Sequence, residues 1–309
     1  MTDKISILFN PSAGRGRAVG KKDRLEEALR KHGVVFDLVV TQSEEELRTL
    51  TREHAGTYRT IVGAGGDSTF HIMANEILRV GADVRLGMIG VGSSNDIAKE
   101  FGLDSLDRAG AALRKGGARK IDVGCIVKDG APLRYYLGQA NIGLGAIVNQ
   151  YVEALSARRP SLGKRQTLAG MMGAIHAFRS GEIPFPLTVE AESGRVAGEY
   201  TIAVFCNIRY WASGKIIAPT ARPGDGKLDA CLIGDCSFGR LLLIASMSRR
   251  GKHVRAKEVE MLTSPSFEIA SERSFKIQTD GDILGGYQQP DRFHKITLTV
   301  LPQALTVIC

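Results

Sequence analysis

Residues 60–69 read Thr-Ile-Val-Gly-Ala-Gly-Gly-Asp-Ser-Thr, and the fold class can be inferred from these ten residues outward. Its first three residues form a β-branched run that is typical of a short strand. Glycines and small polar residues follow, and Thr69–Arg79 then shows the apolar spacing of a helix. A strand, a glycine loop and a helix in this order predict a βα unit whose loop lies at the carboxyl end of the strand.

Two further loops share this composition, namely Asn10-Pro-Ser-Ala-Gly-Arg-Gly16 and Gly90-Val-Gly-Ser-Ser-Asn-Asp96. Glycine permits positive φ and leaves successive N–H groups free to point at one anion. A helix that follows such a loop adds further donors at its N-terminus. Any one loop is equally typical of a tight, capped turn. Three of them at successive strand ends predict a shared crevice that holds a polyphosphate.

The first 124 residues alternate between strand and helix patterns. We expect strands at residues 5–10, 34–40, 60–62 and 84–89, and helices at Lys21–His32, Ser43–His54, Thr69–Arg79 and Asn95–Phe101. This alternation predicts parallel βαβ units with a binding crevice at the carboxyl ends of the strands.

The pattern changes near Lys120, after which short strand-like segments lie between turn residues. We expect helical interruptions only at about 146–155, 166–178 and 239–249. Strands that follow an α/β half predict a second, mainly antiparallel β domain. We therefore divide the chain into residues 1–124 and 125–309, and the last strands could pack on either domain.

Composition sets limits on the function. Hydrophobic residues make up 43% and charged residues 24% of the 309, which is a normal globular balance. No segment reaches the 18 or so consecutive apolar residues that span a bilayer. The five cysteines form no CxxC pair, so free thiols and a cytoplasmic location are expected. A net charge of +8 is compatible with nucleic acid, anionic lipid or nucleotide phosphates, but no basic block with interleaved aromatics predicts a nucleic-acid partner.

Two common nucleotide motifs are absent. The sequence has no GxxxxGK[ST] stretch, which excludes a P-loop NTPase, and Gly14-x-Gly16 lacks the third glycine of a dinucleotide fingerprint.

The ordered motifs instead resemble the diacylglycerol-kinase catalytic family, which includes bacterial lipid kinases, sphingosine kinases and ceramide kinases. The resemblance rests on Asn10-Pro-x-Ala-Gly-x-Gly, Gly65-Gly-Asp-Ser-Thr69 and Gly92-Ser-Ser-Asn-Asp96. It continues through Asn141-x-Gly-x-Gly145, Asn207, Ala218-Pro219, Asp225-Gly-Lys-Leu-Asp229, Gly251-Lys-His253 and Asp280-Gly-Asp282, so it covers nearly the whole chain in order.

The resemblance implies roles for individual residues. Those expected to bind the nucleotide are Asn10, Ser12, Gly14, Thr41, Gly65, Gly66, Asp67, Ser68, Thr69, Gly92, Ser93, Asn95 and Asp96. Asp280 is implied as the general base, Asp67 as a metal or catalytic carboxylate, and Asp225 as a ligand of a structural magnesium. ATP and Mg²⁺ are the implied cosubstrate and cofactor, which suits phosphoryl transfer. Simpler interpretations stay open, because Asp96 could cap a helix and Asp280-Gly281 could form a hairpin turn.

Four positions depart from the family pattern. Ser68 replaces a glycine, Ile72 a glutamate near the nucleotide, Gly90 a proline and Asp282 a glutamate. His71 and His253 are more typical of satisfied or surface histidines than of catalytic ones.

The leading hypothesis is an ATP-dependent lipid kinase that acts on a hydroxyl of a membrane lipid such as diacylglycerol. The acyl chains of this lipid would occupy an apolar pocket in the second domain. Two basic stretches, Arg158-Arg159 and Arg249-Arg250-x-Lys252, could make a peripheral contact with anionic bilayers. A homodimer is a further expectation. The alternatives are an NAD-kinase-like enzyme with a small soluble acceptor, and a nucleotide- or lipid-binding protein with little catalysis.

Overall fold

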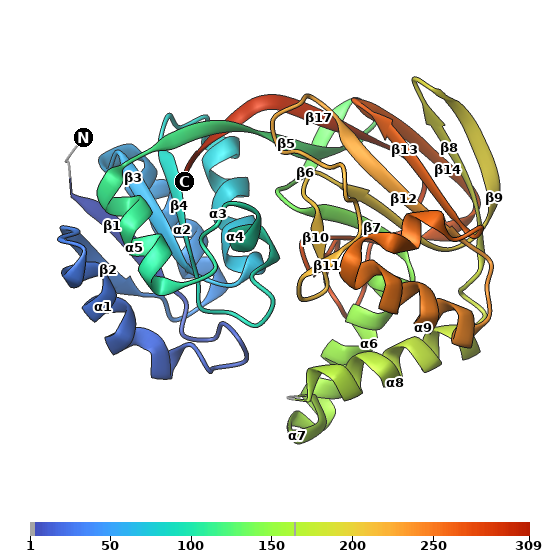
Figure 1. Cartoon of the computed structure of the whole chain (residues 1–309), viewed down its shortest axis with the longest axis horizontal. Coiled ribbons are helices and arrows are strands. Elements are labelled where there is room, and N and C mark those ends of the chain that lie inside the picture. The colour runs from blue at the N-terminus through green and yellow to red at the C-terminus, as the bar shows by residue number, and fades with distance from the viewer. Residues whose placement is uncertain (1–3, 164) are drawn as a thin grey trace.

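The computed structural model describes residues 4–163 and 165–309, and it has two lobes joined by long strands (Figure 1). The N-terminal lobe contains β1 (Ile5–Phe9), α1 (Lys22–Lys31), β2 (Phe36–Val40), α2 (Glu44–Thr57), β3 (Thr60–Gly65), α3 (Asp67–Val80), β4 (Arg85–Gly90), α4 (Asp96–Glu100) and α5 (Leu106–Lys115). A short 3₁₀ turn, η1 (Val19–Lys21), precedes α1.

The four strands of this lobe form a parallel sheet in the order β2-β1-β3-β4. Alternate residues of each strand point to opposite faces. Ile7 and Phe9 therefore pack with α1 and α5, whereas Leu8 packs with α2 and α3. Because the strands are parallel, the loops after β1, β3 and β4 meet at one edge, as the glycine loops predicted.

The C-terminal lobe is a mainly antiparallel β structure. Its strands are β6 (Ala131–Tyr136), β7 (Gln139–Gly143), β8 (Phe185–Ala191), β9 (Gly194–Cys206), β10 (Tyr210–Trp211), β11 (Lys215–Ile216), β12 (Leu228–Gly234), β13 (Val259–Ser264), β14 (Ser266–Phe275), β15 (Ile277–Thr279) and β16 (Asp282–Ile283). The α/β lobe with its parallel sheet and this antiparallel lobe confirm the predicted fold class.

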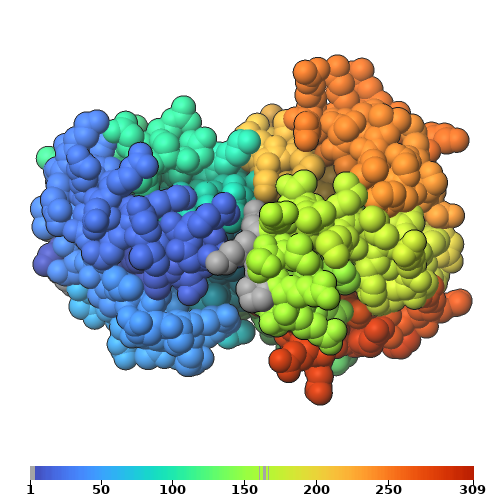
Figure 2. Space-filling model, turned by 90° about the horizontal axis from the view of Figure 1, so that it is seen from below, coloured from blue at the N-terminus to red at the C-terminus, as the bar shows by residue number. Residues whose placement is uncertain are grey.

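Helices gather on one side of the C-terminal lobe (Figure 1). They are α6 (Leu144–Arg158), α7 (Pro160–Gly163), α8 (Gln166–Arg179) and α9 (Phe238–Met247), followed by the 3₁₀ turns η2 (Ser248–Arg250) and η3 (Lys252–Arg255). Seen from below, the segment that carries α6 and α8 (green) covers the C-terminal lobe where it faces the N-terminal lobe (Figure 2). No helix in the described part of the chain is both long and apolar enough to cross a membrane.

Two long strands connect the lobes. They are β5 (Ala118–Lys128) and β17 (Phe293–Ile308), which pair with each other and run from one lobe to the other (Figure 1). One end of β17 pairs with β14, and its other end pairs in parallel with β4. The last residues of the chain thus lie in the N-terminal sheet. The predicted division at residues 124 and 125 falls inside β5, and it stays a prediction.

Candidate active site

A cavity of about 420 Å³ lies where the two lobes meet. Its polar end carries three aspartates, Asp67, Asp96 and Asp280. The remaining wall is largely apolar and comes from α6, α8, α9 and neighbouring strands, with Leu144, Val148, Met171, Ile202, Phe238 and Leu241 among its members. The structure therefore brings together three aspartates that are far apart in the sequence, and joins them to an apolar space.

Asp67 links the second and third glycine loops. It is the first residue of α3, and its carboxylate accepts hydrogen bonds from the backbone N–H groups of Ile97 (2.9 Å) and Asp96 (3.2 Å) at the start of α4. Burial, and next the negative charge of Asp96, raise the pKa of Asp67 to about 7. This carboxyl group is thus poised to gain or lose a proton near neutral pH.

Asp96 connects the two lobes. It is buried at 4% exposure, and its two carboxylate oxygens accept from the N–H groups of Ser213 (3.0 Å) and Gly214 (2.6 Å) in the β10–β11 hairpin. Burial raises the pKa of Asp96, although these two hydrogen bonds act in the opposite direction. Asp96 is also the first residue of α4. It therefore has both the position at the start of a helix and the place at the cavity that the sequence suggested.

Asp280 is both a turn residue and part of the cavity wall. Asp280 and Gly281 have φ values of 49° and 97° between β15 and β16, which is the left-handed backbone of a tight hairpin turn. The carboxylate accepts from the N–H groups of Leu137 (2.7 Å), Gly138 (2.8 Å) and Gln139 (2.9 Å). The turn interpretation and the site interpretation are therefore compatible.

His71 completes the surroundings of Asp280. It is buried at 1% exposure, and its Nδ1 lies 3.1 Å from Asp280 Oδ2. Its Nε2 lies 3.2 Å from the guanidinium of Arg134, which can only donate, so the ring proton belongs on Nδ1 and points at Asp280. Arg134 also binds Asp282 at 2.6 Å. His71 is a satisfied histidine, and it contributes a fourth hydrogen bond to Asp280.

The three glycine loops contact one another closely. Asn10 Nδ2 donates to Thr69 Oγ1 at 2.9 Å, which ties the first loop to the second. A Cβ added to Gly92 would lie 2.6 Å from the Cα of Gly66, and one added to Gly65 would lie 2.1 Å from Thr69 Oγ1. These distances explain why the loops need glycine at 65 and 92, and they leave backbone N–H groups at a shared edge.

The other predicted nucleotide residues lie at the same edge in different environments. Asn10 Oδ1 accepts from the N–H of Ser12, and a Cβ on Gly14 would lie 3.6 Å from Ser93 Oγ. Asn95, with φ of 54°, turns the chain into α4. Thr41 is buried at 3% exposure, and its hydroxyl donates to the carbonyl of Phe9. Their nucleotide contacts stay predictions.

Two basic residues of this edge were missed from the sequence. Arg17 donates to the carbonyl of Gly14 and to Ser93 Oγ, both at 2.9 Å, and Lys21 donates to the carbonyl of Val91 at 2.9 Å. Burial, helped by the charge of Arg17, lowers the pKa of Lys21. The alternation of glycine and arginine at residues 14–17 was the available signal for Arg17, and both cations lie beside the glycine loops.

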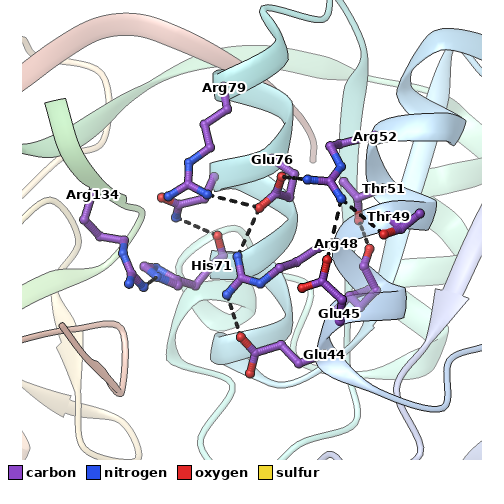
Figure 3. A network of polar contacts seen from close by, with 12 residues as sticks. Glu44, Glu45, Arg48, Thr49, Thr51, Arg52, His71, Glu76, Arg79 and Arg134 are labelled. Carbon is purple, nitrogen blue, oxygen red and sulfur yellow. Dashed lines mark hydrogen bonds and ion pairs between the residues drawn. The ribbon is translucent and has the colours of Figure 1, made fainter. Parts of the chain in front are cut away.

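The structure accommodates two of the four departures from the family pattern, Ser68 and Ile72. Ser68 lies in the first turn of α3 with ordinary helical φ, so its Cβ causes no backbone strain. Ile72 is packed in the core, and the buried carboxylate of this helix is Glu76, one turn later. Three arginines, Arg48, Arg52 and Arg79, bind Glu76 (Figure 3). They compensate a carboxylate whose unpaired burial would be costly.

The predicted magnesium ligand Asp225 lies away from this cavity. It is exposed in the loop before β12, where it accepts from the N–H of Lys227 at 3.1 Å. Within residues 4–163 and 165–309, no group of three or more His, Cys, Asp and Glu side chains is arranged to hold a metal ion. The magnesium role of Asp225 therefore stays a prediction.

Comparisons with known proteins agree with this geometry. The family model of the diacylglycerol kinase catalytic domain matches residues 4–126, and that of the YegS C-terminal NAD kinase beta sandwich-like domain matches residues 138–309. A diacylglycerol kinase of Mycobacterium tuberculosis is 28% identical over 283 residues, which are 90% of this chain and 88% of that protein. A probable YegS-like lipid kinase of Pseudomonas aeruginosa is 25% identical over 99% of this chain and 94% of its own length.

A solved structure supports the fold. A diacylglycerol kinase of Bacillus anthracis superposes with a TM-score of 0.70 at 17% identity, over 100% of this chain and 98% of the other. At that identity the likeness concerns the fold alone. The two family models together cover nearly all of the sequence, and the second covers more than half of it. The chain therefore belongs to the diacylglycerol kinase family of lipid kinases, in the form that carries a YegS-like C-terminal domain.

Proposed function

We propose that this chain is an ATP-dependent lipid kinase that transfers the γ-phosphate to a hydroxyl group of a membrane lipid, with diacylglycerol as the first acceptor to test. One observation carries the proposal. A single cavity has three aspartates at one end and an apolar wall from α6, α8 and α9 along the rest. Such a space suits an acceptor with a polar head and a hydrocarbon chain, and it suits a soluble acceptor such as NAD poorly.

ATP would lie along the three glycine loops. Backbone N–H groups at the carboxyl ends of β1, β3 and β4, together with Arg17 and Lys21, supply the donors and the positive charge that phosphates need. Mg²⁺ that accompanies a nucleotide is held mainly by phosphate oxygens and water. The described residues offer no three-ligand cage, so they fit an ion carried by ATP, which would neutralise charge on the phosphates during transfer.

The hydrogen bonds favour Asp67 over Asp280 as the general base. Each oxygen of Asp280 already accepts two hydrogen bonds, one set from Gly138 and Gln139 and the other from Leu137 and His71. Each oxygen of Asp67 accepts one, and a pKa of about 7 suits proton transfer near neutrality. We therefore propose that Asp67 accepts the proton of the acceptor hydroxyl, and that Asp280 fixes the β6–β7 turn beside it.

We also propose that the face of α8 and α9 rests on the membrane. Five large apolar side chains are exposed there, at 39–49%: Leu168, Met171, Ile175, Leu242 and Leu243. Met171 and Leu242 also line the cavity, so a lipid chain could pass directly from the bilayer into it. The exposed pairs Arg158-Arg159 and Arg249-Arg250 flank these helices, as expected for a peripheral contact with anionic lipids.

The experiment is transfer of the γ-phosphate of Mg-ATP into a panel of lipids in mixed micelles, with NAD as a soluble acceptor in parallel. The proposal expects label in a lipid and none in NAD, with Asp67→Asn and Asp280→Asn variants measured alongside. Label in NAD alone would contradict the lipid-kinase proposal and indicate a kinase for soluble small molecules. Tight ATP binding without transfer to any acceptor would replace it with a binding protein.

A further inference from the structure

One cation lies at the aspartate end of the cavity. Lys215, in β11, lines the same cavity as Asp67, Asp96 and Asp280, and it is the one Lys or Arg among the described residues of that wall. Its side chain is partly buried, and Nζ donates to the carbonyl of Ala212 at 2.8 Å. In the described part of the chain, no carboxylate lies within ion-pair distance of this ammonium group.

Two further cations approach the same hairpin. The Nζ of Lys99 lies 4.3 Å from the centre of the Tyr210 ring, and only 2.8 Å from the position that a Cβ on Gly214 would take. Arg249 lies in η2, which packs on β11. Neither of these side chains has an ion-pair partner in residues 4–163 and 165–309. Three cations therefore surround one hairpin.

Their charges act on one another and on Asp96. Burial lowers the pKa of Lys215, with the charge of Asp96 opposing this effect and that of Arg249 adding to it. Burial likewise raises the pKa of Asp96, and Lys99 and Lys215 are among the groups that oppose the rise. Lys99 and Lys215 act on Asp96, and Arg249 acts on Lys215, so the hairpin side of the cavity carries positive charge that can attract a further anion.

The hairpin backbone holds these groups in place. Ala212, Ser213 and Gly214 have φ values of 48°, 69° and 85°, and the first two are costly for residues that carry a side chain. The N–H groups of Ser213 and Gly214 bind Asp96 across the lobes. The strained turn thus fixes Lys215 at a set position relative to the reacting end of the cavity.

We propose that Lys215, supported by Lys99 and Arg249, forms a phosphate-binding subsite on the acceptor side, which holds the phosphate group as it arrives on the lipid. The inference rests on the proposed function. During transfer the bond from the γ-phosphorus to ADP breaks, a bond to the acceptor oxygen forms, and the acceptor proton passes to Asp67. The product is a phosphate monoester whose charge three aspartates alone would repel. Lys215 offsets that repulsion at the point where the charge appears.

The test uses the full chain, diacylglycerol as acceptor and phosphatidic acid as its product, both in mixed micelles. If the wild type phosphorylates another lipid, that lipid and its phosphate ester are used instead. In Lys215→Met, the affinity for phosphatidic acid should fall at least about tenfold and kcat about tenfold to a hundredfold. The affinity for diacylglycerol should stay within about twofold, because the neutral lipid makes no charge-assisted contact. Lys215→Arg should restore most of the product affinity.

Controls separate this role from a structural one. Lys257→Met makes the same change at an exposed position outside the cavity and should alter neither quantity. Inorganic phosphate should compete with phosphatidic acid in the wild type and much less in Lys215→Met. Equal competition in both proteins, or unchanged product affinity in a folded Lys215→Met, would overturn the proposed phosphate subsite. Neither result would contradict the proposed kinase activity. Absence of transfer by the wild type would overturn the proposed function instead, and the binding comparison would still test the subsite.

Discussion

The two sides of the cleft are built in different ways. On the N-terminal side, three short loops fix one another through close contacts, such as Gly66 against Gly92 and Asn10 bound to Thr69. On the C-terminal side, many apolar side chains from α6, α8 and α9 line the cavity. Under the proposed function, phosphate binding should depend on a few residues of fixed type and lipid binding on the total volume of the cavity. Substitutions should therefore affect the two sides differently.

The largest effect is expected where the two sides meet, at Asp67. Asp67→Asn keeps a hydrogen-bond acceptor for the start of α4 but removes the base, so kcat should fall about 10²- to 10⁴-fold. ATP affinity and thermal stability should change little. Steady-state kinetics and ATP titration check this, with Asp83→Asn as a matched control in an exposed loop. A loss of less than about threefold would assign the base to another group.

The second effect concerns the lipid side alone. Ala174, in α8, lines the cavity, and Ala174→Trp should fill part of it. If the acyl chain of the lipid loses apolar contact for two or three methylenes, the loss is about 0.8 kcal/mol for each, and kcat/KM for long-chain lipids should fall about thirtyfold. Short-chain acceptors and ATP affinity should be spared. The same substitution at the exposed Ala154 of α6 is the control. An equal loss for short and long chains would contradict the assignment of the cavity.

The pH profile sharpens the comparison. Because Asp67 must be ionised to accept a proton and its pKa is about 7, activity should fall about tenfold per pH unit well below 7 and level off above it. The charge of Asp96 helps to raise this pKa, so Asp96→Asn should move the inflection to lower pH. Profiles of kcat for both proteins between pH 5.5 and 8.5 test this. A flat wild-type profile would argue against Asp67.

The last effect concerns the phosphate side alone. Gly92→Ala places a Cβ 2.6 Å from the Cα of Gly66, so the two loops must separate. Stability should fall by about 1–3 kcal/mol, and ATP binding should weaken while lipid affinity stays unchanged. Gly20→Ala is the control, since nothing lies within 4 Å of that Cβ. Unchanged ATP binding in Gly92→Ala would show that the loops do not hold the nucleotide.

Much of the N-terminal fold followed from sequence, because its elements have strong local signals. The helix expected at Ser43–His54 is α2, where Ser43 accepts from the N–H of Glu46 as a cap. Helix α5 was not predicted, although Ser105 at its start and Gly116 at its end are a normal pair of caps. The strand β17 crosses between the lobes, and no local pattern indicates such a long-range pairing.

The residues of the site likewise fall into those that sequence motifs predicted and those that only the tertiary structure reveals. Asp67, Asp96 and Asp280 were expected from motifs, and the structure brings them to one cavity. Lys215 was not expected, because a lysine after a small-residue turn has no distinctive pattern, and its importance arises only from the hairpin that faces Asp96. Three of the four hydrogen bonds that Asp280 accepts come from Leu137, Gly138 and Gln139, more than 130 residues away, and sequence alone does not show this contact.

The proposed function and the role of Asp67 are tested most directly by a crystal structure of the protein with a non-hydrolysable ATP analogue and a short-chain diacylglycerol. We expect the triphosphate to lie on the three glycine loops, the free hydroxyl to lie within hydrogen-bond distance of Asp67, and an acyl chain to occupy the cavity between α6, α8 and α9. A lipid bound elsewhere, with that cavity empty and its hydroxyl remote from Asp67, would contradict it.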